Sequence, residues 1–195
     1  MQLSILLWGG GVFRFLKKPT ATSNEYSWAA SAVLAAKEFK IAPELFIALI
    51  LNESSGNPLA TRWERRFYIR YICDKPLHQI GGNQPAEIDN YQETIERLCR
   101  AYSWGLCQIM GQTAREFGFR GRSLWELLDQ DTNTKLGAQI FAHKRDQALK
   151  KNPNATDQER DRLTLLAYNG GGDLEYPERV YKRHQAASAI VKQCG

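Results

Sequence analysis

The sequence lacks the residue patterns that mark several common protein classes. None of its four cysteines form a C-x-x-C pair, so we expect no structural zinc site. It contains no internal repeat, and few stretches alternate polar with apolar residues as half-buried strands do. The chain is therefore predicted to be mainly α.

The cysteines do not indicate a redox compartment. Their number is even, which permits disulfides, but free buried thiols explain them equally well. The four residues are Cys73, Cys99, Cys107 and Cys194.

The apolar stretch at residues 1–16 fits neither a signal peptide nor a membrane helix well, and it leaves open a signal-like or membrane-associating segment or a strand that packs on the domain. No basic residue precedes its hydrophobic part, and Gly9, Gly10 and Gly11 interrupt it. A membrane helix needs about twenty apolar residues. We therefore assign residues 1–22 to an N-terminal appendage and linker, and residues 23–195 to one domain.

The charge of the chain favours an anionic partner without choosing one. The formal net charge is +5, from 26 basic and 21 acidic residues. The densest basic cluster interleaves aromatic residues with Arg62, Arg65, Arg66 and Arg70. Its aromatic rings can stack on bases, stack on sugar rings or pack internally. Because the last two explain the cluster as well as the first, we predict no nucleic-acid partner.

Helical periodicity recurs along most of the domain. Residues 28–39 and 88–102 show apolar spacings of three and four, residues 106–117 read as a helix interrupted near Gly111, and residues 177–191 supply a final helix. We expect Asp131 or Thr132 to cap the helix through residues 136–149. A capping box of Thr156 and Glu159 should start the next one. These elements predict a single helical globular domain.

Residues 43–58 predict a buried helix that ends on one carboxylate. Pro43 and Glu44 suit a helix start, and residues 45–51 are apolar on nearly every side. Glu53 follows, immediately before a turn. Loss of solvation there raises a carboxyl pKa, as a general acid near neutral pH requires. The alternative is a glutamate that caps the helix or faces solvent.

Two further segments place polar groups beside glycines. Ser103 and Gly105 allow close backbone approach, and Gln108 adds an amide to an apolar run, although an ordinary helix start explains the same residues. Tyr168 and Asn169 precede two glycines and can point into a cleft, although a glycine C-cap is the alternative.

Three motifs follow one another along the chain: E-S at residues 53–54, S-x-G-L-x-Q-I at residues 103–109 and A-Y-N-G-G at residues 167–171. Together they resemble the soluble-type lytic transglycosylases, which are lysozyme-like, goose-type-related domains that cleave peptidoglycan. Residues 176–181 look like that family's closing segment. The resemblance covers roughly residues 23–183. The chain also looks like versions of this domain carried by bacteriophages. The resemblance implies an α+β lysozyme-like fold with a catalytic cleft.

The resemblance implies a role for each matching residue. Glu53 matches the single catalytic glutamate, which protonates the glycosidic oxygen between N-acetylmuramic acid and N-acetylglucosamine. It then acts as base on the muramyl O6 hydroxyl, and a 1,6-anhydro ring forms. Ser103, Gln108, Tyr168 and Asn169 match residues that contact the substrate or orient the glutamate.

The sequence departs from the family in two places. Cys107 stands where the family usually has methionine or phenylalanine, and an insert at about residues 61–102 separates the first two motifs. The insert can form a lid, an additional sugar-binding wall or a contact for another protein. It contains Glu64, which either pairs with a neighbouring arginine or faces the cleft. In the cleft, Glu64 would act as a second carboxylate and the enzyme would hydrolyse its substrate like a goose-type lysozyme.

The resemblance also bears on partners and location. It implies that peptidoglycan glycan strands are the partner and that no cofactor or metal is needed, and we expect a monomer. The enzyme would act in the periplasm or cell wall, or in association with a phage, by an export route that the sequence does not indicate. A cell-wall or assembly binding module without turnover is the alternative from another class.

Overall fold

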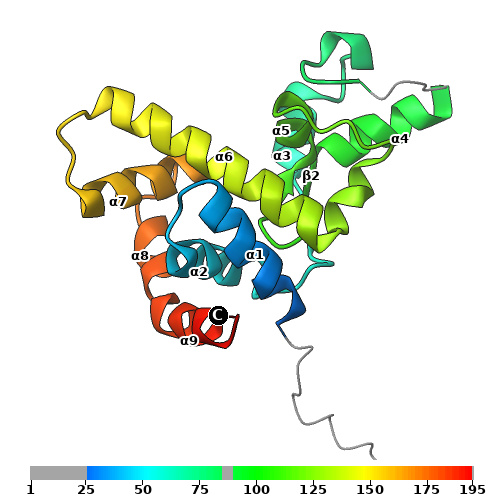
Figure 1. Ribbon diagram of the computed structural model, residues 1–195. Coiled ribbons are helices and arrows are strands. Elements are labelled where there is room, and N and C mark those ends of the chain that lie inside the picture. Colours follow the sequence, from blue (N-terminus) through cyan, green and yellow to red (C-terminus); the bar gives the residue numbers. More distant parts are fainter. Residues whose placement is uncertain (1–25, 85–89, 195) are drawn as a thin grey trace, which may run out of the picture.

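Helices make up most of the structure, and the mainly α prediction is confirmed (Figure 1). The computed structural model describes residues 26–84 and 90–194. The appendage assigned to residues 1–22 lies outside the described residues. In chain order the elements are α1 (Ser27–Glu38), α2 (Pro43–Ser54), β1 (Thr61–Trp63), α3 (Arg65–Tyr71), η1 (Leu77–Gln79), α4 (Asn90–Arg100), β2 (Tyr102–Trp104), β3 (Ile109–Met110), α5 (Gly111–Glu116), η2 (Leu124–Leu128), α6 (Gln130–Lys151), α7 (Asp157–Tyr168), α8 (Tyr176–Tyr181) and α9 (His184–Cys194).

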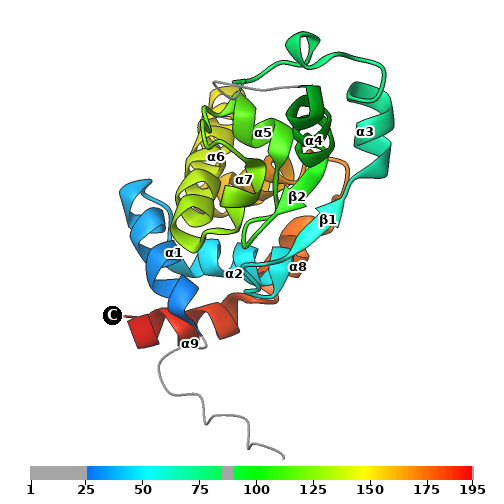
Figure 2. The same cartoon turned by 90° about the vertical axis from the view of Figure 1, so that its right-hand side faces the viewer.

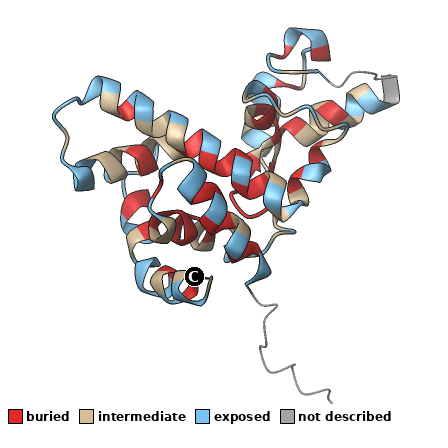
Figure 3. Ribbon diagram, viewed as in Figure 1, coloured by how far each residue is buried: buried red, intermediate tan, exposed pale blue. Residues whose placement is uncertain are grey.

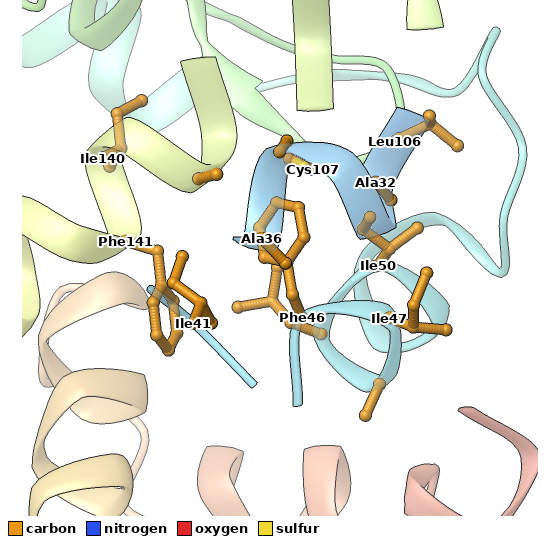
Figure 4. Close-up of a cluster of buried hydrophobic side chains, with 14 of the residues drawn as sticks. Ala32, Ala36, Ile41, Phe46, Ile47, Ile50, Leu106, Cys107, Ile140 and Phe141 are labelled. Atoms are coloured by element: carbon orange, nitrogen blue, oxygen red, sulfur yellow. The ribbon is translucent and has the colours of Figure 1, made fainter. Parts of the chain in front are cut away.

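Helix α2 forms the centre of the hydrophobic core. Every residue from Leu45 to Ile50 is buried, because this helix is apolar on all sides and packs against α1, α8 and α9 (Figure 3). Figure 4 shows Phe46 and Ile47 of α2 among side chains from α1, α6 and the segment after β2. Burying such a side chain stabilises the fold by about 1.5–3 kcal/mol. The buried helix that the sequence predicts before Glu53 is confirmed.

Helix α6 runs across the molecule and packs on α1, α7 and η2 (Figure 1, Figure 2). Its cap is Asp129, whose carboxylate accepts the Thr132 N–H at 2.9 Å. The predicted cap, Asp131 or Thr132, was therefore wrong, because η2 ends at Leu128 and leaves Asp129 as the extended residue. The capping box predicted at the start of α7 is confirmed. No helix in the described ranges combines the length and apolar character that a membrane crossing requires.

A three-stranded antiparallel sheet in the order β1-β2-β3 joins the first residues of the insert to the segment that follows it. Thr61 pairs with Trp104, and Ser103 pairs with Met110. This pairing corrects the prediction of a helix over residues 106–117, since residues 109–110 bond to β2 as a strand and only Gly111–Glu116 is helical. The predicted final helix is likewise divided into α8 and α9.

The insert begins in β1 and ends at β2, so its two ends lie side by side. Helix α3, which carries most of the basic cluster, buries none of its residues. The insert has a small apolar cluster of its own, formed by Ile72, Leu77 and Ile80 with Phe67 and Tyr68 packed against it. The insert therefore adds a small substructure beside the main core.

A buried ion network attaches the insert to α5. The Nε atoms of Arg100 and Arg115 both donate to Oε1 of Glu96, at 2.9 and 2.8 Å, and all three side chains are almost fully buried. The remaining guanidinium N–H groups include donors to backbone carbonyls in residues 81–83 and 119–121. One carboxylate thus compensates two buried cations from α4 and α5.

Removing that carboxylate should destabilise the protein strongly. We expect Glu96→Ala to lower the free energy of unfolding by about 3–5 kcal/mol, because it leaves two buried guanidinium groups without a counter-charge. Urea denaturation measures the change.

Glu38→Ala is the matched control, since Glu38 forms an exposed ion pair with Lys135 at 3.2 Å and its loss should cost about 0–1 kcal/mol. Equal losses in the two variants would contradict a special role for the buried network.

Candidate active site

Glu53 lies in the last turn of α2, and its carboxyl group accepts a hydrogen bond from the hydroxyl of Tyr176. Helix α2 ends just beyond it, where Ser55 takes the left-handed conformation with φ of 55°. Tyr176 is the first residue of α8 and is 3% exposed. The packing of α8 on α2 therefore brings together two residues that lie far apart in the sequence.

Burial raises the pKa of the Glu53 carboxyl above its ordinary value of 4.5. Desolvation is the largest cause, since it disfavours the charged form. The hydrogen bond from Tyr176, the charges of Arg62 and Arg179, and a hydrogen bond from Asn52 act in the opposite direction. The net direction is upward, so Glu53 keeps its proton to higher pH than an exposed glutamate, as its place at the end of a buried helix predicts.

Tyr176 is itself held in place by its surroundings. Burial and the adjacent Glu53 raise the pKa of Tyr176, so its hydroxyl stays protonated and remains a donor. The Arg179 guanidinium lies 5.7 Å from the centre of the Tyr176 ring and forms an ion pair with Asp173. Sequence reasoning gave Tyr176 no role. Its only signal was its place in the closing segment 176–181.

The turn between β2 and β3 is fixed by the buried side chain of Asn133 in α6. Its Oδ1 accepts the Cys107 N–H at 2.8 Å, and its Nδ2 donates to the carbonyls of Trp104 and Leu127 at 2.9 and 2.8 Å. Gly105 permits this approach, because its φ is +67° and a Cβ there would lie 2.5 Å from that Nδ2. The close backbone approach predicted at Gly105 is confirmed.

This turn presents Gln108 to the adjacent pocket. The backbone φ of Gln108 is 46°, and its Nε2 donates to the carbonyls of Ala60 and Gly105 at 3.1 and 3.0 Å. Both N–H groups of the amide are thereby used. The Oε1 atom remains to accept a hydrogen bond from a ligand.

Tyr168 and Asn169 lie at the end of α7. The Tyr168 hydroxyl donates to the Cys107 carbonyl at 2.9 Å, and its ring packs on Phe141 with a centroid separation of 6.0 Å. Tyr168 thus supports the turn that carries Gln108, while the hydroxyl bonded to Glu53 belongs to Tyr176. Asn169 is exposed and contributes to the pocket lining.

Ser103 and Glu64 contact each other beside the β1–β2 pair. The Ser103 Oγ donates to Oε1 of Glu64 at 3.1 Å, and the Arg62 Nε donates to the same oxygen at 2.5 Å. The sequence offered two alternatives for Glu64, pairing with an arginine or facing the cleft. The structure shows both, since Glu64 pairs with Arg62 and lines the same pocket as Glu53.

All of the site residues predicted from the sequence line one pocket of about 350 Å³. Its walls come from α2, β1, α5, α6, α7 and the segment that includes β2 and β3. The lining residues are Glu53, Arg62, Glu64, Ser103, Gln108, Ile109, Met110, Thr113, Ile140, Lys144, Ala167, Tyr168, Asn169 and Gly170. Among the described residues, no group of three or more His, Cys, Asp or Glu side chains is arranged to hold a metal ion. Carboxyl, hydroxyl and amide groups facing one pocket suit a ligand rich in hydroxyl groups.

Comparison with known families matches residues 31–189 to the transglycosylase SLT domain. The chain belongs to this family. Comparisons of this SLT domain with curated proteins and with solved structures returned no significant match.

Membership confirms the resemblance and the type of activity. The SLT domain is a lytic transglycosylase, so the protein is an enzyme that acts on peptidoglycan, a polymer outside the cytoplasm. The mainly helical structure with a small sheet is compatible with the lysozyme-like fold expected of an SLT domain. The alternative of a binding module without turnover is not what the family indicates.

The raised pKa of Glu53 should make stability depend on pH. The folded state binds the Glu53 proton more tightly than the unfolded state does. The desolvation cost is therefore absent below about pH 4.5 and is imposed as pH rises through the folded-state pKa. Glu53→Gln removes this cost, so the variant should melt at a higher temperature than wild type at pH 7 and at a similar temperature near pH 4.

Thermal melts of the wild-type protein and of Glu53→Gln from pH 4 to pH 8 measure this difference in melting temperature. A variant that melts well below wild type at every pH would show that Glu53 is structural.

Proposed function

We propose that this lytic transglycosylase cleaves the β-1,4 bond between N-acetylmuramic acid and N-acetylglucosamine and forms a 1,6-anhydromuramic acid end, with Glu53 as its single general acid and base. The observation that carries the proposal is the partly buried Glu53 carboxyl group, which lines the pocket and has a raised pKa. A general acid must hold its proton near the working pH, and burial supplies that property.

The reaction needs one carboxyl group in two successive roles. Protonated Glu53 gives its proton to the glycosidic oxygen as the bond from that oxygen to C1 of the muramyl residue breaks. The resulting carboxylate then takes the proton of the muramyl O6 hydroxyl, and O6 bonds to C1. Glu53 is protonated again at the end, and no water is consumed.

Neighbouring residues support each role of Glu53. Tyr176 holds one carboxyl oxygen, which leaves the other to face the glycosidic oxygen and then O6. The positive charges of Arg62 and Arg179 lower the Glu53 pKa and so stabilise the carboxylate that forms after proton transfer. The Gln108 Oε1 and the Asn169 amide are suited to hold sugar hydroxyl and acetamido groups in the pocket.

A second candidate function is hydrolysis with Glu64 as a second carboxylate. The observation that favours it is that Glu64 lines the same pocket as Glu53. Both hydrogen bonds to the Glu64 carboxylate within the described residues reach Oε1, so Oε2 can accept a bond from water. Against this role, Arg62 and Ser103 hold Glu64 in an ion pair and a hydrogen bond that position it as part of the wall.

We also propose that the insert forms an additional wall of the sugar-binding cleft. Arg62 and Glu64, both within the insert, line the pocket directly. We further propose that the protein acts as a monomer on glycan strands.

Loss of the Glu53 carboxyl group should abolish lysis. We expect Glu53→Gln to reduce the rate by about 10²–10⁴-fold in a turbidity assay on purified cell walls, because the amide cannot transfer a proton. Mass spectrometry of wild-type digests should show 1,6-anhydro ends. Reducing ends in their place would contradict the transglycosylase reaction, and full lysis by Glu53→Gln would exclude this residue as the catalyst.

Glu64→Gln separates the two candidate reactions. If Glu64 belongs to the wall, the variant should keep most of the activity and yield the same anhydro ends as wild type. Digestion of the same walls with both proteins, followed by mass spectrometry, compares the products. A loss comparable to that of Glu53→Gln would support Glu64 as a catalytic carboxylate.

A further inference from the structure

Two cationic side chains line the pocket, and their surroundings differ. Arg62 is paired with Glu64 at 2.5 Å, so its charge is compensated. Lys144 of α6 has no ion pair with any residue in the described ranges, although its side chain is half-buried at the pocket wall. Glu53 is neutral when it carries the proton that catalysis requires. The pocket ready to react therefore carries a net positive charge at Lys144.

Lys144 lies further along α6 than the residues that pack against the turn after β2. Gly137, two turns earlier on α6, lies against Cys107, where a Cβ would be 2.5 Å from the sulfur. Lys144 follows seven residues later, which is about 10 Å further along the helix axis. His143 packs edge-on against Phe117 with a centroid separation of 5.1 Å, which fixes this part of α6 relative to the end of α5. Lys144 is thus held at a distance from the turn that carries Gln108.

The sugar rings of the glycan strand carry no formal charge, so hydroxyl and amide groups suffice to bind them. Carboxylates occur on the lactyl arm of the muramyl residue, either directly or at the peptide stem attached to it. A cation without a counter-charge inside a partly buried cleft attracts such a carboxylate more strongly than a neutral hydroxyl.

We propose that Lys144 binds a carboxylate of the muramyl substituent and thereby selects muramyl-containing strands over neutral N-acetylglucosamine polymers. This assignment rests on the proposed function, because it takes the pocket as the glycan-binding cleft. Lys144 acts here as a specificity-determining residue and takes no part in proton transfer.

Binding to three ligands in the Glu53→Gln background tests the proposal without turnover. The ligands are an N-acetylglucosamine oligomer with no carboxylate, a peptide-free glycan with lactyl carboxylates, and a glycan with peptide stems. Lys144→Met should weaken binding of at least one carboxylate-bearing ligand by roughly tenfold and leave the neutral oligomer unchanged. The ligand that loses affinity identifies whether the lactyl or the stem carboxylate is bound.

Lys150→Met is the matched control, since Lys150 is an exposed lysine on the same helix outside the pocket. It should change none of the three affinities, and Lys144→Arg should retain most of the preference for carboxylate. If Lys144→Met weakens the binding of all three ligands equally, or of none of them, the assignment to Lys144 is overturned. If the parent protein binds no glycan at all, the proposed function of the pocket fails instead.

Discussion

The arrangement of the site depends on one buried amide, that of Asn133. Its three hydrogen bonds join α6, the end of η2 and the turn after β2, and each polar atom of the amide is used. Gln108 and the carbonyl that receives the Tyr168 hydroxyl both belong to that turn. An amide satisfied in this way rigidifies its surroundings, whereas a partly satisfied one would carry a desolvation cost. The walls of the pocket thus take their positions from a residue that does not line it.

The catalytic proposal rests on a balance of opposing electrostatic effects at Glu53. A fully apolar site would raise the pKa until the carboxylate could no longer form, and the second half of the reaction would fail. A well-solvated site would leave no proton to donate. Tyr176 and Arg179 of α8 and Arg62 of β1 moderate the effect of burial on the Glu53 pKa. The same carboxyl group can therefore serve as acid and then as base.

Features that depend on neighbouring residues could be predicted from the sequence. Contacts between segments that are distant in the sequence could not. The buried helix before Glu53 followed from consecutive apolar residues, and the close approach at Gly105 followed from a missing side chain. The strand at residues 109–110 is too short to show alternation, so it was read as helix. Tyr176 meets Glu53 only through the packing of α8 on α2. Lys144 carried no signal, because a lysine on a helix usually faces solvent.

The pairing of β1 with β2 has a consequence for how the chain can vary. Trp63 lies opposite Tyr102, so a tight hairpin could connect them without changing the register of the sheet. Residues 64–101 therefore form a cassette that could be exchanged, and a change in its length would cost little chain entropy. Arg115 limits this freedom, because its counter-charge, Glu96, belongs to the cassette. A natural or engineered version that lost the cassette would be stable only if position 115 changed at the same time.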